Sequence, residues 1–164
     1  MSDPVNLRSL DLNAHSPLTC RYAVRRDDDP AHPMVLVLEI EGEYRSGTEG
    51  NPDAAFIEAH ALAGLARWSP CALVLDLQKL VFPWGNALLG VIQGIHRYMG
   101  TDDAEEAPDD EGSFPVIIVS AEHNRDALLA LWGAPEPQAH WHFRTLQGAL
   151  DDAAIRAGAW LDSE

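Results

Sequence analysis

Hydrophobic residues recur with two different periods along the chain, and the alternation between these periods predicts the order of its elements. LTCRYAVRR (18–26) alternates, and MVLVLEIEGEYR (34–45) begins apolar and then alternates, so we expect two strands paired as a hairpin across the turn DDDPAHP. The short, largely apolar runs CALVLDL (71–77) and FPVIIVS (114–120) predict buried strands. The alternation in HWHFRTL (140–146) is typical of an edge strand.

Segments with apolar side chains at helical spacing separate most of these strands. Helices are expected at 51–68, 87–99, 124–133 and 147–161. Asn124 is the expected N-cap of the third helix, and Gly100 and Gly133 are expected to stop the second and third. Because strands joined through helices pair in parallel, the sequence predicts an α/β fold: a mixed, mostly parallel sheet with an N-terminal antiparallel hairpin and four helices.

The size of the chain suits one domain with one core. Its 164 residues are 46% hydrophobic, and we expect a domain over 18–164 after an extended polar segment at 1–17. Cys20 and Cys71 are expected to be reduced core thiols, as in a reducing compartment. No stretch approaches about 18 uninterrupted apolar residues and no secretory signal is present, so a soluble cytoplasmic protein is expected.

The charge of the chain narrows the classes of partner. Lys and Arg number 11 against 26 Asp and Glu, and the net charge of −15 repels nucleic acid phosphates and anionic membranes. A basic protein partner suits this field, although solubility explains the charge equally well. The segment at 101–113 has no base and is expected to be a solvated loop able to dock a cationic protein. Its seven acids are Asp102, Asp103, Glu105, Glu106, Asp109, Asp110 and Glu111.

The stretch DLQKLVFPWGNALLGVI (76–92) reads as the end of a strand, a tight turn and the start of a helix. Ligands gather at such turns in α/β sheets, because the helix N–H groups point outward there. After Asp76 the turn contains no nucleophile, hydroxyl or acid. A tryptophan beside a glycine either covers the core or serves as an exposed anchor for a partner. We therefore treat Trp84, Gly85 and Asn86 as a candidate binding corner.

The element order over roughly residues 18–162 resembles the STAS family, the fold of anti-anti-sigma factors and of the cytoplasmic tails of anion transporters. The stretch VLDLQKLVFPWGNALLGVI (74–92) is similar to that family's strand, Asp-Leu, and glycine-containing turn into a helix. The resemblance implies binding to a regulatory, kinase-like protein. Family members that act as switches carry a phosphorylatable Ser or Thr in this turn, and here none lies between Asp76 and Met99. The resemblance therefore implies constitutive binding.

An enzymatic alternative stays open. The outward backbone amides of the turn also resemble the crotonase superfamily, in which such amides hold an oxyanion, but the segment GEYRSG (42–47) is the nearest second candidate and lies on a strand. Ser120, Glu122 and His123 at a strand end are the closest approach to a hydrolase constellation, and a helix-capping turn explains them as well.

The histidines suggest no metal site. His140 and His142 share one face of the expected edge strand, but no third ligand lies close in sequence. His60 and His96 are expected to be satisfied at helix interfaces. No nucleotide-binding glycine motif is present, so no cofactor is expected.

These features together predict a non-catalytic module that binds another protein. It is either a STAS-like regulator or an acidic immunity or antitoxin-like inhibitor of a basic toxin. The alternative is a small enzyme of crotonase-like or hydrolase type.

Overall fold

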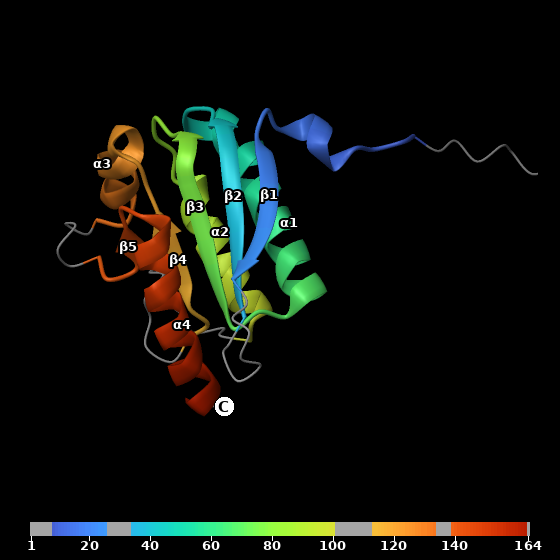
Figure 1. Ribbon diagram of the computed structural model, residues 1–164. Coiled ribbons are helices and arrows are strands. Elements are labelled where there is room, and N and C mark those ends of the chain that lie inside the picture. Colours follow the sequence, from blue (N-terminus) through green and yellow to red (C-terminus); the bar gives the residue numbers. More distant parts are fainter. Residues whose placement is uncertain (1–7, 26–33, 101–112, 134–138, 164) are drawn as a thin grey trace, which may run out of the picture.

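The computed structural model describes residues 8–25, 34–100, 113–133 and 139–163, and within them the chain forms one mixed sheet with helices on both faces (Figure 1). The elements are η1 (Leu12–His15), β1 (Thr19–Arg25), β2 (Val35–Glu43), η2 (Gly47–Gly50), α1 (Asn51–Trp68), β3 (Ala72–Val81), α2 (Ala87–Tyr98), β4 (Val116–Val119), α3 (Glu122–Leu131), β5 (His142–Phe143) and α4 (Leu146–Ser163).

The strands lie in the order β1-β2-β3-β4-β5. Strand β1 pairs with β2 in an antiparallel hairpin, and each later pair is parallel. The predicted fold class is therefore confirmed: a mixed, mostly parallel sheet with an N-terminal hairpin and, in the described ranges, four α-helices.

The alternation of side chains along the strands divides the core between two faces of the sheet. Leu36 and Leu38 of β2 belong to the larger core beneath α1 and α2, whereas Val35 and Val37 belong to the smaller core beneath α4. Helix α4 lies against the sheet through three buried alanines spaced four residues apart, Ala149, Ala153 and Ala157. In Figure 1, α4 crosses in front of the sheet and α1 and α2 lie behind it.

Strand β3 contains an irregularity that lengthens it beyond its predicted end. Glu39 pairs with Asp76, but Glu41 pairs with Lys79, so β3 contains one residue more than β2 over this interval. The extra residue reverses the alternation, which places Lys79 on the surface and Leu80 in the core. The predicted strand end at residue 77 is therefore wrong, because the bulge interrupts the alternation of inward and outward side chains from which that end was predicted.

The longer β3 gives the sheet a stepped carboxyl edge. Strand β4 ends at Val119, which pairs with Asp76, whereas β3 continues to Val81. Over residues 77–81, β3 has β2 on one side and no strand on the other within the described residues. Its backbone carbonyls on that side need other partners.

Two further expectations differ from the structure near its C-terminal part. The edge strand expected over 140–146 contains only His142 and Phe143. It is short because Trp141 turns into the core against Trp132, with ring centroids 5.0 Å apart, and α4 starts at Leu146. Helix α3 starts at Glu122, so the prediction of Asn124 as its N-cap is wrong.

Both cysteines are free and half-buried against the cores, and burial raises the pKa of the Cys20 thiol to about 12. Among the helices in the described ranges, none combines the length and the apolar character needed to cross a lipid bilayer.

Candidate functional site

The turn between β3 and α2 presents Trp84 at the carboxyl edge of the sheet. Its side chain is 61% exposed. The carbonyl of Trp84 accepts a hydrogen bond of 3.3 Å from the N–H of Gly47, and a β-carbon at Gly47 would lie 3.1 Å from Cη2 of the indole. Gly47 also has a φ of +59°, which favours glycine. The β2–α1 loop therefore holds the tryptophan by its backbone and leaves most of the ring in solvent.

A buried aromatic pair supports this turn from below. Tyr44 is 2% exposed, and its ring lies edge-on to Phe82 with centroids 5.0 Å apart. A β-carbon at Gly85 would lie 3.1 Å from Cε1 of Tyr44, so the turn approaches the tyrosine at a distance that suits glycine. Burial, and then the negative charge of Asp53, raise the pKa of Tyr44 to about 12. Gly85 is thus a packing residue, and Trp84 is the side chain that faces outward.

Asn86 lies beside Trp84 at the start of α2. It occupies the N-cap position, but its side chain makes no capping hydrogen bond and is exposed. Val81, 48% exposed, and the exposed Pro83 shortly precede Trp84 in the chain. We call Val81, Pro83, Trp84 and Asn86 the Trp84 corner.

Asp53 fixes the loop on which Trp84 rests. This carboxylate is fully buried in the first turn of α1. It accepts hydrogen bonds from the backbone N–H of Arg45 (2.8 Å), from Nε and Nη2 of Arg45 (3.0 and 2.6 Å), and from the Ser16 hydroxyl (2.7 Å). Arg45 also donates to the carbonyl of His15 (3.0 Å). One carboxylate thus joins the N-terminal segment, the β2–α1 loop and α1.

These hydrogen bonds decide the ionisation of Asp53. Burial by itself raises the pKa of Asp53, but the hydrogen bonds from the side chain and backbone of Arg45 and from Ser16 outweigh it and lower the pKa below its usual value. Asp53 is therefore the ionised member of a partly buried ion pair, because the Arg45 side chain stays 40% exposed.

Two side chains of α3 make hydrogen bonds to backbone carbonyls in the part of β3 that extends beyond β4. The amide nitrogen of Asn124 donates to the carbonyls of Leu77 and Leu80, both at 2.7 Å, and its carbonyl oxygen accepts from the N–H of Ala121 at 3.0 Å. Nε2 of His123 lies 3.0 Å from the carbonyl of Leu80. The last residues of β3, which lead to the Trp84 corner, are therefore attached to α3.

Ser120, Glu122 and His123, the closest approach to a hydrolase constellation in the sequence, are not brought together at one exposed site. The Ser120 side chain is fully buried, and its hydroxyl lies 2.5 Å from Nε2 of His142, which is 8% exposed. His123 contacts the carbonyl of Leu80, and Glu122 is exposed. The Ser120–His142 hydrogen bond joins the residue after β4 to β5, and both residues are buried. The sequence held one sign of this pair: Ser120 and His142 are polar residues in two segments whose other inward-facing residues are apolar.

The two histidines of the expected edge strand do not form a chelate. His142 is buried, whereas His140 is exposed and precedes β5. Within the residues that the structure describes, no group of three or more His, Cys, Asp or Glu side chains is arranged to hold a metal ion. His60 lies at the α1–β1 interface, where the Tyr22 hydroxyl donates to its carbonyl at 2.7 Å. The acidic residues expected to dock a partner, at 102–111, lie outside the described residues.

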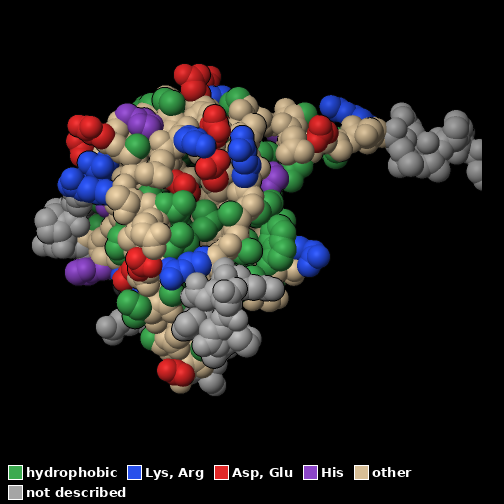
Figure 2. All heavy atoms as spheres, viewed as in Figure 1, with side chains coloured by type: hydrophobic (Ala, Val, Ile, Leu, Met, Phe, Trp, Pro, Cys, Tyr) green, Lys and Arg blue, Asp and Glu red, His purple; other side chains and the backbone are tan. Residues whose placement is uncertain are grey.

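Asp76, which opens the motif noted in the sequence, lies on the α4 side of the sheet and is 5% exposed. Its Oδ1 accepts a hydrogen bond of 3.1 Å from the N–H of Gln78. Burial raises the pKa of Asp76, the bond from Gln78 opposes this, and the negative charge of Glu39 on β2 raises it further. Figure 2 shows acidic and basic side chains side by side on this face of the sheet, and Lys79 bonds to Glu39 at 3.2 Å.

Replacing Asp76 with asparagine is expected to stabilise the protein modestly at pH 7. A carboxyl whose folded pKa is raised contributes stability at low pH that is lost as the pH rises through the folded pKa, so the ionised group opposes folding at neutral pH. Asparagine keeps the acceptor for Gln78. Urea unfolding of Asp76→Asn and of the exposed control Asp126→Asn measures the effect, and a lower stability for Asp76→Asn at pH 7 contradicts it.

Comparisons with known proteins give similarities to solved structures. No family model matches the chain, and no curated protein sequence matches it. One match among solved structures is the crystal structure of an anti-sigma factor antagonist from Mycobacterium paratuberculosis, with a TM-score of 0.44 and 18% sequence identity over 82% of this chain and 94% of that chain. The match concerns the arrangement of elements alone. The order of strands and helices along the chain is the one on which the STAS resemblance of the sequence rests.

Proposed function

We propose that this chain is a non-catalytic module that holds a partner protein at the Trp84 corner. The observation that carries the proposal is the 61% exposure of Trp84 on a loop that is itself fixed. Tryptophan is enriched among the residues that contribute most to protein interfaces, and exposing its large apolar surface to water is unfavourable. A partner that covers the ring removes this surface from water.

The corner is organised before binding, which favours affinity. The indole lies against Gly47, and the loop beneath it is tied to Asp53 through Arg45. Little conformational entropy is therefore lost when a partner covers the ring. Exposed acidic residues, Glu43 at the end of β2 and Glu49 in η2, lie on the two segments that border the loop. The partner surface that fits is an apolar socket with basic groups at its rim.

The chemistry of the corner favours holding over switching. The segment from Leu77 to Tyr98 contains no hydroxyl except that of Tyr98, so phosphorylation of a Ser or Thr has no target there. We propose constitutive binding, either by a regulator of a kinase-like protein or by an inhibitor of a basic toxin. The burial of the Ser120–His142 pair supports the non-catalytic proposal over the hydrolase alternative.

Replacing Trp84 with alanine is expected to weaken partner binding by about thirtyfold or more, the effect of removing a residue that contributes 2 kcal/mol or more to an interface. The full chain, Trp84→Ala and Ile155→Ala serve as baits in an extract of the native cell, with recovered proteins quantified by mass spectrometry. Ile155 is 73% exposed on α4 and is the matched control. We expect one stoichiometric partner with the wild-type and Ile155→Ala baits and its loss with Trp84→Ala.

Two results contradict the proposal. Recovery of no stoichiometric partner speaks against a binding module, and equal recovery by Trp84→Ala places the interface elsewhere. When a partner is found, its own sequence separates the two roles: a kinase-like regulatory protein indicates a regulator, and a basic toxin indicates an inhibitor.

A further inference from the structure

An open groove lies at the amino-terminal edge of the sheet, at the end of the molecule opposite the Trp84 corner. Cys71, which precedes β3, contributes to it, whereas Trp84 follows the far end of the same strand. Its volume is about 450 Å³. The residues that line it are mostly apolar, and they include Leu65, Tyr98, Met99, Trp160 and Leu161.

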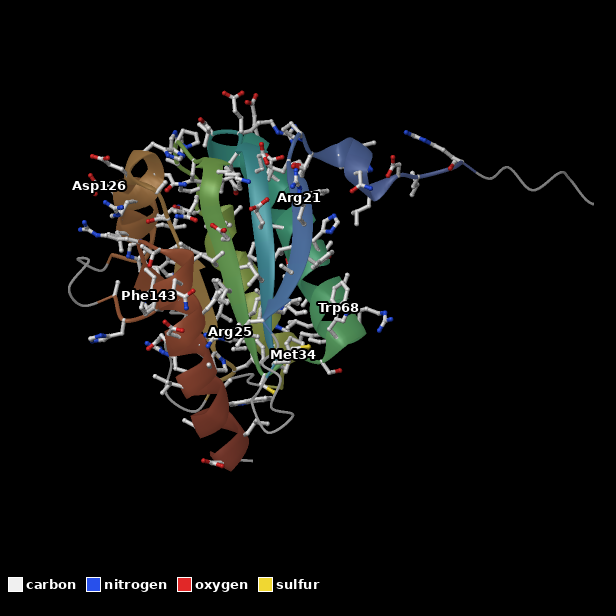
Figure 3. All side chains as sticks on the ribbon, viewed as in Figure 1. Arg21, Arg25, Met34, Trp68, Asp126 and Phe143 are labelled. Carbon is white, nitrogen blue, oxygen red and sulfur yellow. The ribbon has the colours of Figure 1, made fainter. Side chains whose placement is uncertain are left out.

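Three helices end at this groove. Its walls come from the last turn of α1, from the end of α2 at Tyr98 and from the last turns of α4. Figure 1 shows the three C-terminal ends at the same end of the molecule, and Figure 3 places Met34 and Trp68 there as well. Helix C-termini carry partial negative charge and carbonyl groups that lack partners within the helix.

The side chains that line the groove are compatible with a positively charged ligand at these helix ends. Among the residues that the structure describes, no Lys, Arg, Asp or Glu lines the groove. Trp160 is fixed edge-on against the buried Phe114, with centroids 5.3 Å apart and rings at 90°. Tyr98 is 50% exposed and Leu161 is 45% exposed. Aromatic faces attract cations, and the net charge of −15 draws cations toward the molecule.

The size of the groove favours a small ligand over a protein segment as its occupant. A volume of about 450 Å³ lies within the range of small-molecule sites. A docked helix needs a longer groove with anchors spaced over several turns. We propose that the groove binds a small amphiphilic cation, with its apolar tail on Leu65, Met99 and Leu161 and its positive head group at the helix carbonyl ends.

Two arginines near the groove would favour an anionic ligand if they reached it. Arg67 and Arg97 lie in the last turns of α1 and α2, but neither lines the groove, and the guanidinium of Arg67 lies 6.0 Å from the ring centroid of Trp68. If either arginine reached a ligand, an anionic amphiphile would bind instead. The sign of the preferred head group therefore tests the proposal directly.

The test uses two amphiphiles with the same ten-carbon tail, decyltrimethylammonium and decyl sulfate, below the concentrations at which they form micelles. Protein labelled at its methionine methyl groups reports binding by NMR, because the chain has only three methionines and Met99 lines the groove. We expect saturable shifts of the Met99 methyl with the cation and none with the anion. Leu161→Ser and Tyr98→Ser are expected to weaken binding by about tenfold each, and Ile155→Ser is expected to leave it unchanged.

Each other outcome overturns the proposal. Equal or tighter binding of decyl sulfate assigns the groove to anions. Shifts of Met99 that do not saturate, or that persist in Leu161→Ser and Tyr98→Ser, show general attraction to an acidic protein. Both substituted side chains are about half exposed, so the variants are expected to keep the far-UV circular dichroism of the wild type. The test is independent of partner binding at the Trp84 corner.

Discussion

Replacing Asp53 with alanine is expected to lower the free energy of unfolding by about 2 kcal/mol at pH 7, less than the cost of breaking a fully buried ion pair, because the Arg45 side chain is 40% exposed. The substitution leaves the Arg45 guanidinium, the Arg45 backbone N–H and the Ser16 hydroxyl without their shared acceptor. Chemical denaturation measures the loss. A second variant, Asp53→Asn, keeps the shape but removes the charge and is expected to recover only part of it.

The effect of Asp53 has a defined pH dependence. The pKa of this carboxyl is lowered in the folded protein, so its contribution is complete above the unfolded value of about 4 and is lost as the pH falls through the folded pKa. The stability difference between wild type and Asp53→Asn should therefore shrink in acid and be constant near neutrality.

An exposed ion pair supplies the control. Asp151 bonds to Arg25 at 2.9 Å, but its side chain is 56% exposed. Asp151→Ala is expected to change stability far less than Asp53→Ala does, because water screens surface pairs. Equal losses for Asp53→Ala and Asp151→Ala would show that the burial of Asp53 has no energetic consequence.

Replacing Asn124 with alanine is expected to cost about 3 kcal/mol, since it leaves the buried carbonyls of Leu77 and Leu80 and the N–H of Ala121 without the partners that Asn124 supplies. Asn124→Asp keeps the acceptor for Ala121 but has no amide to donate, so it should lose most of the same stability. Urea unfolding measures both variants.

The exposed Asn86 is the matched control for Asn124. Its side chain makes no capping hydrogen bond, so Asn86→Ala is expected to stay within about 0.5 kcal/mol of wild type. A loss below about 1 kcal/mol for Asn124→Ala would mean that other groups, such as His123, satisfy β3 without it.

Local patterning was sufficient to predict the hairpin, the parallel strands and the four helices, because each depends on residues close in sequence. The bulge in β3 was not predictable in this way. The sequence LQKL (77–80) by itself indicates the end of a strand. Its pairing with β2 shows that β3 has one extra residue here and that Leu80 lies in the core. Register depends on the neighbouring strand, which the alternation of a single segment does not contain.

The candidate site likewise has a part that local sequence predicts and a part that depends on residues distant in the chain. The corner with Trp84, Gly85 and Asn86 was identified from the strand-to-helix turn, but the sequence left open whether the tryptophan covers the core or faces solvent. The contacts of Gly47 and Tyr44 decide this, and both residues are distant in sequence. Asp53 is a second case, because its place in the first turn of α1 does not identify its partners. Its role in joining Arg45 and Ser16 depends on contacts across 8 and 37 residues of chain.

The stepped edge of the sheet has a consequence for association between molecules. A strand with an unpaired side offers its N–H and C=O groups to any extended chain, which is a common route to aggregation. Within the described residues, positions 77–81 of β3 have no strand on the side away from β2, and the side chains of Asn124 and His123 already bond to the carbonyls of Leu77 and Leu80. The start of α3 therefore blocks strand addition at this edge, so the surface left for recognition beside it is made of side chains.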